Sequence, residues 1–233
     1  MSGFFYVQKV TSNTKIMFKK RFKVLVACEE SQAITKEFRN MGHDAYSCDL
    51  LPCSGGHPEW HYQEDVFEVI KKQEWDIMIA HPPCTYLAVS GARWMYNKDG
   101  SVNEERLKNQ HDALDFVKRL MDAPIKSIAI ENPISVISSQ IRKPDQIVHP
   151  YHFGDKASKS TCLWLKNLPK LEHTEVVEKG EFKEWIDKKS GKLKKQAKWY
   201  YDALITAKSS AERRTLRSKT FKGMAEAIAD QWG

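Results

Sequence analysis

The chain has 233 residues, of which 41% are hydrophobic and 29% charged, and its formal net charge is +7. Ten Phe, seven Trp and eight Tyr exclude a chain that is disordered throughout, because so many aromatic side chains can build a core. No apolar run reaches the roughly 18 residues of a membrane-spanning helix, so no membrane partner is expected. We expect one globular domain with a small appendage. The positive charge suits a polyanionic partner such as nucleic acid.

The chain contains five cysteines, an odd number, and its first residues lack the features of a secretory signal peptide. We therefore expect unpaired thiols in a reducing, cytoplasmic environment. Residues 1–21 are interpreted as a solvated leader that ends in a basic cluster.

Strand and helix patterns alternate from residue 22 to about residue 165. Short apolar segments predict strands at 23–28, 43–48, 75–80, 127–130 and 161–165. Apolar residues at helical spacing predict helices at 31–41, 65–73 and 103–121. Strands that alternate with helices form βαβ units. The pattern predicts an α/β, Rossmann-like domain over 22–165, with a mostly parallel central sheet and helices on both faces.

The composition changes after this domain. Residues 166–217 are dense in Lys and Glu with interleaved Trp and Tyr, and their apolar periodicity is weak. We interpret them as a small, exposed, basic insertion of hairpin or helical character. Residues 218–233 become helical again, which predicts a C-terminal helix that packs back on the main domain.

A cysteine stands after two prolines at the end of one predicted strand, in Ile79-Ala-His-Pro-Pro-Cys84. Ligands bind outside the carboxyl ends of the strands in such sheets, so the thiol is expected to face a crevice. The prolines fix the backbone there and cannot continue the strand ladder. The chemistry that suits such a thiol is nucleophilic addition. The alternative is a buried cysteine with a structural role only.

A carboxylate ends the next strand, in Ile128-Ala-Ile-Glu131-Asn132-Pro133. Glu131 is expected to point into the same crevice, where it can hydrogen-bond a ring nitrogen of a bound base, or protonate it if its pKa is raised. The alternative is a plain turn at the end of the strand. His81 either tunes the thiol of Cys84 or caps the strand.

Four residues of zinc-binding types follow one another in Cys48-x4-Cys53-x3-His57-x3-His61. Cys48 is expected inside a strand, where its side chain can face the core. We therefore favour no metal and a loop that lines a cofactor or substrate site. His57, Trp60 and His61 would stack on or hydrogen-bond the ligand in that case.

The Pro-Pro-Cys and Glu-Asn-Pro segments, in this order at the ends of successive strands, resemble the DNA cytosine-C5 methyltransferase family. In that family a Pro-Cys motif carries the nucleophile and a Glu-Asn-Val motif carries the acid, so the resemblance makes Cys84 and Glu131 the catalytic residues. It implies a Rossmann-like methyltransferase fold and looks most like the compact members of phage and prophage genomes. Residues 166–217 would be a reduced recognition region, and residues 218–232 resemble the family's closing motif.

The resemblance also implies a cofactor, S-adenosylmethionine or a carboxylated derivative of it. The residues that it assigns to cofactor binding are Cys28, Glu29, Ser31, Asp49, Leu50, Asp65 and Pro82. The residues that it assigns to the substrate are Pro83, Tyr86, Ser90, Arg93, Asn132, Lys159 and Thr161. Two departures stand out: the family's first loop is rich in glycine whereas Cys28-Glu-Glu-Ser-Gln32 has none, and Lys159 stands where the family has arginine.

The function implied is transfer of a methyl-type group to C5 of cytosine in DNA, duplex or single strand, through a covalent bond from Cys84 to C6. The same chemistry on a free pyrimidine nucleotide is one alternative, and a catalytically inactive DNA-binding paralogue is another. Arg93 and Trp94 would fill the space left by a displaced base or hold the backbone. Four cationic residues are either phosphate contacts or a solvated face, namely Arg213, Arg214, Arg217 and Lys219. The sequence leaves the oligomeric state open.

Overall fold

The computed structural model describes residues 20–233, apart from the side chains of residues 211 and 214. The leader expected at 1–21 lies almost wholly outside the described residues. Seven strands form one sheet in the order β3-β2-β1-β4-β5-β7-β6. They are β1 (Lys23–Ala27), β2 (Asp44–Cys48), β3 (His61–Tyr62), β4 (Ile77–Ala80), β5 (Ser127–Pro133), β6 (Gln146–Val148) and β7 (Thr161–Lys166).

The sheet is mostly parallel, as predicted. Strands β1 to β5 pair in parallel, and only β7 runs antiparallel to its neighbours β5 and β6. The arrangement is the doubly wound order 3-2-1-4-5-6 with one antiparallel strand inserted between β5 and β6. The α/β, Rossmann-like fold class is therefore confirmed. The order reverses beside β1, because β2 lies on one side of it and β4 on the other.

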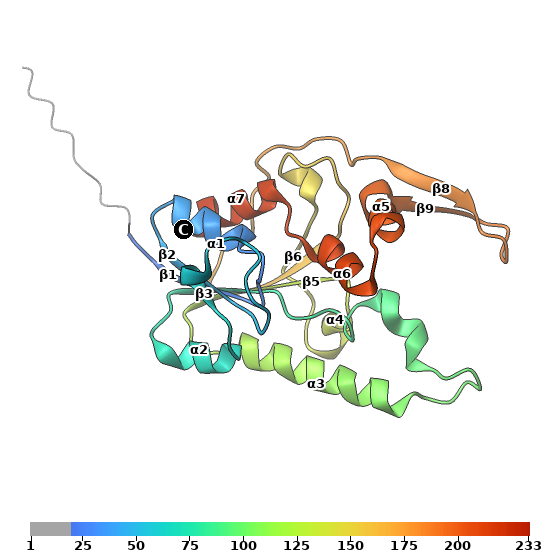
Figure 1. Ribbon diagram of the computed structural model, residues 1–233, viewed down its shortest axis with the longest axis horizontal. Coiled ribbons are helices and arrows are strands. Elements are labelled where there is room, and N and C mark those ends of the chain that lie inside the picture. Colours follow the sequence, from blue (N-terminus) through green and yellow to red (C-terminus); the bar gives the residue numbers. More distant parts are fainter. Residues whose placement is uncertain (1–19) are drawn as a thin grey trace, which may run out of the picture.

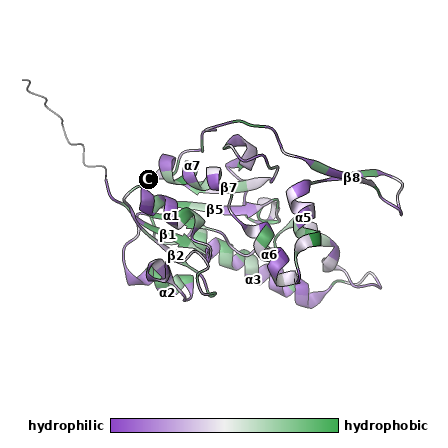
Figure 2. Cartoon of the chain, turned by 45° about the horizontal axis from the view of Figure 1, so that its top comes forward, coloured by the Kyte–Doolittle hydropathy of each residue, from purple (hydrophilic) through white to green (hydrophobic). Residues whose placement is uncertain are grey.

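Helices cover both faces of the sheet (Figure 1). One face carries α1 (Ala33–Asn40) and α7 (Lys222–Trp232), and the other carries α2 (Val66–Lys72), α3 (Glu104–Met121) and the short α4 (Ile137–Gln140). Alternate side chains of β1 divide between two cores, since Val24 and Val26 pack with α1 and α7 whereas Leu25 and Ala27 pack with α2 and α3. Figure 2 shows hydrophobic residues concentrated between these layers.

The predicted helix limits follow from capping side chains. The helix α2 begins after Asp65, whose carboxylate accepts a hydrogen bond from the backbone N–H of Phe67. The helix α3 begins after Asn103, which caps the N–H of Arg106 in the same way. Gly42 follows the end of α1 with a left-handed φ of 88°, which glycine adopts without steric cost. Three short 3₁₀ segments lie in the connections, at Pro58–Trp60, Val89–Met95 and Pro150–His152.

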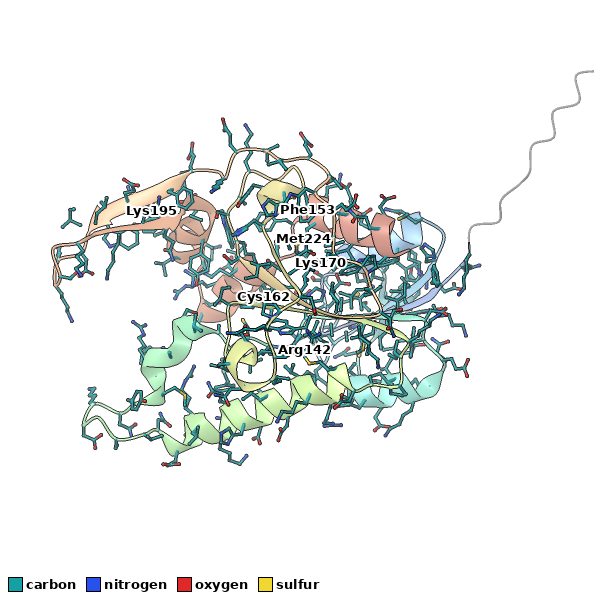
Figure 3. All side chains as sticks on the ribbon, turned by 180° about the vertical axis from the view of Figure 1, so that it is seen from behind. Arg142, Phe153, Cys162, Lys170, Lys195 and Met224 are labelled. Carbon is teal, nitrogen blue, oxygen red and sulfur yellow. The ribbon has the colours of Figure 1, made fainter. Side chains whose placement is uncertain are left out.

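The insertion contains both a hairpin and helices. Strands β8 (Phe182–Ile186) and β9 (Leu193–Ala197) form a separate antiparallel sheet, and α5 (Lys198–Thr206) and α6 (Ser210–Ser218) follow. The hairpin projects from the main body, and Figure 3 labels Lys195 on it. None of the helices in the described part of the chain is long and apolar enough to cross a membrane.

The C-terminal helix α7 packs against α1. It buries Met224, Ile228 and Trp232 in the core that α1 shares with the sheet. Gly223 is required at its start, because a Cβ atom there would lie 1.7 Å from the carbonyl oxygen of Phe153.

Candidate active site

The Pro-Pro-Cys segment leaves the sheet directly after β4. Strand β4 ends at Ala80, and the N–H of His81 still donates to the carbonyl of Ala27 on β1. The two prolines that follow have no N–H to extend the ladder. Cys84 is an exposed residue, so it does not lie in the apolar core.

Asn132 fixes this segment to the neighbouring strand β5. Its side-chain amide donates to the carbonyl oxygen of Pro82 at 2.8 Å, and the residue is 1% exposed. Pro82 is buried and Pro83 is exposed. Asn132, predicted to contact substrate, therefore also has a structural role: it holds the backbone that carries Cys84.

His81 pairs with the second predicted catalytic residue. Its Nδ1 lies 3.0 Å from Oε2 of Glu131, and both side chains are largely buried. The alternation of β4 and β5 places both residues on the face of the sheet that α1 and α7 cover. Neither role considered for His81 from the sequence, tuning the thiol or capping the strand, includes this contact with the carboxylate.

The electrostatic setting keeps Glu131 ionised. Burial by itself would raise the pKa of this carboxyl, but the hydrogen bond from His81 and the positive charge of Lys159 outweigh burial, so the pKa lies below its ordinary value. The condition for Glu131 to protonate a bound base, a raised pKa, is therefore not met. The carboxylate is instead suited to accept hydrogen bonds, which is the other role that the sequence offers for it.

The charges of Glu131 and Lys159 both act on the thiol of Cys84. Desolvation and then the negative charge of Glu131 raise the pKa of Cys84, and the positive charge of Lys159 opposes them. The three side chains therefore lie close enough to interact. The sequence predicted that Cys84 and Glu131 would meet, and it assigned Lys159 to the substrate side.

Several buried polar atoms around this cluster have no hydrogen-bond partner among the residues that the structure describes. They are Oε1 of Glu131, Nε2 of His81, Oδ1 of Asn132 and Oγ1 of Thr161. Thr161 begins β7 opposite Pro133, the residue two places after Glu131 on β5. An unsatisfied buried polar atom costs about 1–3 kcal/mol. Such atoms gathered at strand ends indicate a place where a polar ligand binds.

A second group of predicted residues lies at the end of β1. Cys28 and Gln32 have left-handed φ angles of 59° and 57°, so the glycine-free loop adopts a conformation that favours glycine. Desolvation and the negative charges of Asp49 and Asp65 raise the pKa of Cys28. Asp49 and Asp65 therefore lie near Cys28, and the neighbouring Leu50 is 72% exposed.

Glu29, predicted to bind cofactor, has a different role in the structure. It is 4% exposed, and its two oxygens accept hydrogen bonds from the N–H groups of Ile34 and Thr35 and from the Thr35 hydroxyl. It therefore caps α1 and is not directed at a ligand. A carboxylate after a strand looks the same in sequence whether it caps the next helix or faces a ligand.

The loop after β2 packs over the loop after β1. The N–H of Ser54 donates to the carbonyl of Glu30 at 2.8 Å, and a Cβ atom on Gly55 would lie 2.5 Å from the carbonyl oxygen of Ser31. The side chain of Gln32 is completely buried and bonds both backbone groups of His57. These contacts narrow the space above the glycine-free loop that follows β1.

Three of the four residues of the zinc alternative make other contacts within the protein. Among the described residues, no three His, Cys, Asp or Glu side chains come together as metal ligands. Cys48 donates to the carbonyl of Glu64. His57 stacks on Trp60 with ring centroids 3.8 Å apart. His61 contacts the hydroxyl of Ser47 and the carbonyl of Leu51, so these rings are engaged within the protein and are not aimed at a ligand.

The remaining predicted substrate residues lie in the segment after Cys84. Tyr86 is half-buried, Ser90 is exposed, and the guanidinium of Arg93 lies over the ring of Trp94 at 4.5 Å. The structure brings this segment against α3, because Arg106 and Gln110 donate to the carbonyls of Thr85 and Tyr86. Sequence reasoning missed Arg106, since an arginine on a polar helix carries no distinguishing signal.

The cationic candidates near the C-terminus divide between structure and surface. The guanidinium of Arg217 lies 3.7 Å from the ring centroid of Tyr200 and donates to its carbonyl. Lys219 is exposed, and its carbonyl accepts a hydrogen bond from Lys159. Arg213 is half-buried, and the side chain of Arg214 lies outside the described residues.

No family model matches the chain, and no curated protein matches it. Solved structures similar to it include a protein described as a DNA modification methyltransferase encoded within a prophage of E. coli, at 13% identity and a TM-score of 0.36. Another is the Dnmt2 methyltransferase of S. pombe, at 15% identity and a TM-score of 0.37.

The chain spans less than two thirds of the length of either protein. It covers 45% of the prophage protein with 61% of its own residues, and 62% of Dnmt2 with 82% of its own residues. Likenesses at this level do not decide the function. The case for an activity therefore rests on the residues at the strand ends.

Proposed function

We propose that the chain transfers a methyl-type group from S-adenosylmethionine, or a carboxylated derivative of it, to C5 of cytosine in DNA. The observation that carries the proposal is the cluster at the ends of β4 and β5. It combines the thiol of an exposed cysteine, an ionised carboxylate and a lysine with buried polar atoms that have no partner within the described residues. Nucleophilic addition to an electron-poor ring uses these groups.

The thiol reacts as the thiolate. Cys84 gives its proton to solvent, because the lowered pKa of Glu131 makes that carboxylate a weak base, and the thiolate forms a bond to C6 of the ring. The negative charge that develops on the ring is neutralised when N3 takes a proton from solvent, and the Glu131 carboxylate accepts a hydrogen bond from the new N3–H. Lys159 stabilises both the thiolate and the carboxylate, because its charge acts on each. His81 holds the carboxylate in position through Oε2.

The addition makes C5 nucleophilic. S-adenosylmethionine, when bound, supplies an electrophilic methyl group that C5 accepts. C5 then loses its proton to solvent, the bond from C6 to sulfur breaks, and N3 returns its proton to solvent. The thiolate and the ring double bond are restored, so all protons and electron pairs are accounted for.

The residues at the end of β1 and β2 fit part of this cofactor. The carboxylates of Asp49 and Asp65 suit its hydroxyl and amino groups, and the exposed side chain of Leu50 suits an apolar ring face. Cys28 and Pro82 line the strand ends between this region and Cys84. Ser31 stays a candidate. Glu29 is left out, because the cap of α1 occupies both of its oxygens.

DNA is the proposed substrate because of charge. The hairpin of β8 and β9, residues 182–197, carries six lysines and two acidic residues, and all of the lysines are exposed. Lysines on a projecting ribbon neutralise phosphates and steer association. The target base must leave the helix stack at a cost of a few kcal/mol, which phosphate contacts offset.

A DNA-binding protein without catalytic activity is the second candidate. It is favoured by the first loop, where Ser54 and Gly55 pack directly over Glu30 and Ser31 and leave little space above the end of β1. The same chemistry on a free pyrimidine nucleotide is a variant of the main proposal.

The decisive experiment uses an oligonucleotide that contains 5-fluorocytosine, because fluorine at C5 cannot leave as a proton does and the covalent adduct persists. The protein is incubated with this DNA and S-adenosylmethionine, and the product is resolved on a denaturing gel and by mass spectrometry. Cys84→Ser tests the nucleophile. Cys53→Ser is the matched control, since Cys53 is partly exposed but lies in the loop after β2.

We expect an adduct with the wild type and with Cys53→Ser, and none with Cys84→Ser. No adduct from the wild type, combined with equal DNA binding by wild type and Cys84→Ser, would establish the binding protein instead. An adduct with a 5-fluorinated nucleotide but not with the oligonucleotide would establish the nucleotide as substrate.

A further inference from the structure

A hollow opens beside the segment that follows Cys84. It has a volume of about 500 Å³, and it lies between residues 86–98 and the first turns of α3. Three aromatic side chains contribute to its wall, Tyr86, Trp94 and Tyr96. The rest of the wall consists of the side-chain amides of Asn97, Asn103 and Asn109, the cations Lys98 and Arg106, and the carboxylate of Glu105. Figure 1 shows this segment as the loop that precedes α3.

The aromatic rings of the hollow are available to a ligand. Trp94 is 56% exposed and Tyr96 is 62% exposed, which is unusual for side chains that bury well. The loop itself is ordered by its own backbone. Tyr96 and Val102 form a β-bridge, and the N–H of Asn103 donates to the carbonyl of Met95. Trp94 and Tyr96 are therefore held on a defined turn and stay exposed, and the guanidinium of Arg93 lies over the ring of Trp94.

Arg106 connects the hollow to the catalytic cysteine. Its Nη2 donates to the carbonyl of Thr85 at 3.1 Å, one residue after Cys84, and its guanidinium lies 5.3 Å from the ring of Tyr86. Its Nε is buried and has no hydrogen-bond partner among the described residues. A buried donor without a partner is costly unless a ligand or water accepts from it.

We propose that this hollow binds an unstacked nucleotide that flanks the target on the same strand. The inference rests on the proposed function, because it takes the nucleotide at Cys84 as the target. Aromatic faces stack on any base, amides hydrogen-bond base edges, and the guanidinium of Arg106 suits a phosphate or a base carbonyl. The volume lies within the roughly 300–1,000 Å³ of typical ligand sites.

The geometry then selects the strand state of the substrate. Two neighbouring nucleotides held apart from their stack would cost a duplex two unstacking steps of a few kcal/mol each. A single strand or a locally opened duplex avoids most of that cost. The preferred substrate is therefore single-stranded DNA, or DNA with an unpaired region around the target cytosine.

The test is an abasic scan read by fluorescence anisotropy. A labelled single-stranded oligonucleotide with one target cytosine is prepared in a series, each member lacking one base near the target. Affinity is measured for the wild type, for Trp94→Ala and for Tyr96→Ala. Val176→Ala is the control, because Val176 is also an exposed apolar residue, at 66%, and lies outside the hollow.

We expect Trp94→Ala to weaken binding of the intact strand about tenfold, the loss typical of one stacked base. At one flanking position, removal of the base should weaken binding by the wild type by the same factor. At that position the removal should not weaken binding by Trp94→Ala any further. The Val176→Ala protein should behave as the wild type at every position. Tighter binding of the perfect duplex than of the single strand would overturn the inference.

The two proposals fail in different ways. A flanking position is coupled to Trp94 if removal of its base weakens binding by the wild type but not by Trp94→Ala. If an adduct with 5-fluorocytosine forms and no flanking position is coupled to Trp94, the flanking site is overturned and the transfer chemistry still stands. A coupled position without an adduct supports the base-binding hollow and overturns the transfer chemistry. Both results together support a catalytic site and a flanking site on one strand.

Discussion

Replacing Glu29 separates a structural role from a ligand-binding role at the first loop. The resemblance assigned this residue to the cofactor, whereas the structure uses both of its oxygens to cap α1. The substitution Glu29→Ala removes the acceptor for three donors: the N–H groups of Ile34 and Thr35 and the hydroxyl of Thr35. Two of these hydrogen bonds measure 2.7 Å and the third measures 3.3 Å.

The expected loss of stability follows from these contacts. A hydrogen bond to a charged group contributes about 1.5–3 kcal/mol, and the third, longer bond contributes less. The negative charge also interacts favourably with the start of the helix, by about 0.3–1 kcal/mol. Removal of a buried charge recovers part of its desolvation cost. We expect a net loss of about 3–4 kcal/mol, which in a chain of this size lowers Tm by roughly 8–12 °C.

Thermal unfolding followed by circular dichroism measures this loss, and calorimetry with S-adenosylmethionine measures binding. Glu30→Ala is the matched control, because Glu30 is the next residue and bonds the exposed hydroxyl of Ser54; its Tm should fall by less than about 3 °C. Glu29→Gln keeps an acceptor and should bind cofactor as the wild type does. Unchanged Tm for Glu29→Ala with abolished binding for Glu29→Gln would refute the capping role.

Two further experiments test the reactivity of the Cys84 thiol and the backbone conformation at Cys28. The first is alkylation of Cys84 by iodoacetamide, followed by mass spectrometry. It should be faster in Glu131→Gln and slower in Lys159→Met than in the wild type, because Glu131 raises the thiol pKa and Lys159 lowers it. Since the thiol pKa is raised overall, the wild-type rate should still be rising above pH 9, and equal rates in all three proteins would contradict the arrangement. The second is substitution of Cys28, measured by thermal unfolding. Cys28→Gly should unfold at the same temperature as the wild type or higher, whereas Cys28→Val should lose about 1–2 kcal/mol of folding free energy, because a φ of 59° disfavours a β-branched residue. A valine variant as stable as the wild type would show that the loop relaxes.

Local pattern predicted most of the sheet because its strands are short and apolar. The segments at β1 and β4 needed only their own residues, since each buries both faces and is a nearly continuous apolar run. The last three residues of β5 are different. Glu131, Asn132 and Pro133 are poor strand formers, and they are extended because β7 pairs with them. That pairing joins segments far apart in the sequence. The two-residue β3 and the three-residue β6 also depend on partners elsewhere in the chain, so periodicity in the sequence could not reveal these strands or the end of β5.

The same limit applies to the site. The rule that polar residues after parallel strands gather at one edge predicted that Cys84 lies near Glu131, and the charge of Glu131 does raise the pKa of the Cys84 thiol. It could not say which polar residues face a ligand and which face the protein. Glu29 caps a helix, His81 bonds the carboxylate, and His57 stacks on Trp60, because each found a partner from a distant segment. Such partners are set by packing, and the sequence alone does not show them.

The unequal lengths of β4 and β5 explain how the thiol and the carboxylate are held relative to each other. Parallel pairing of the two strands stops at Ala80 and Ile130, because the prolines that follow cannot donate to the ladder. Strand β5 continues with β7 as its only partner, so Glu131 stays on a rigid strand with one edge open. The Pro-Pro-Cys segment lies along that open edge, tied there by the amide of Asn132. The antiparallel strand thus fixes the carboxylate. The buried hydrogen bond from Asn132 to Pro82 and the contact of His81 with Glu131 both link the segment that carries the thiol to β5, so the spacing of the two groups depends on these contacts.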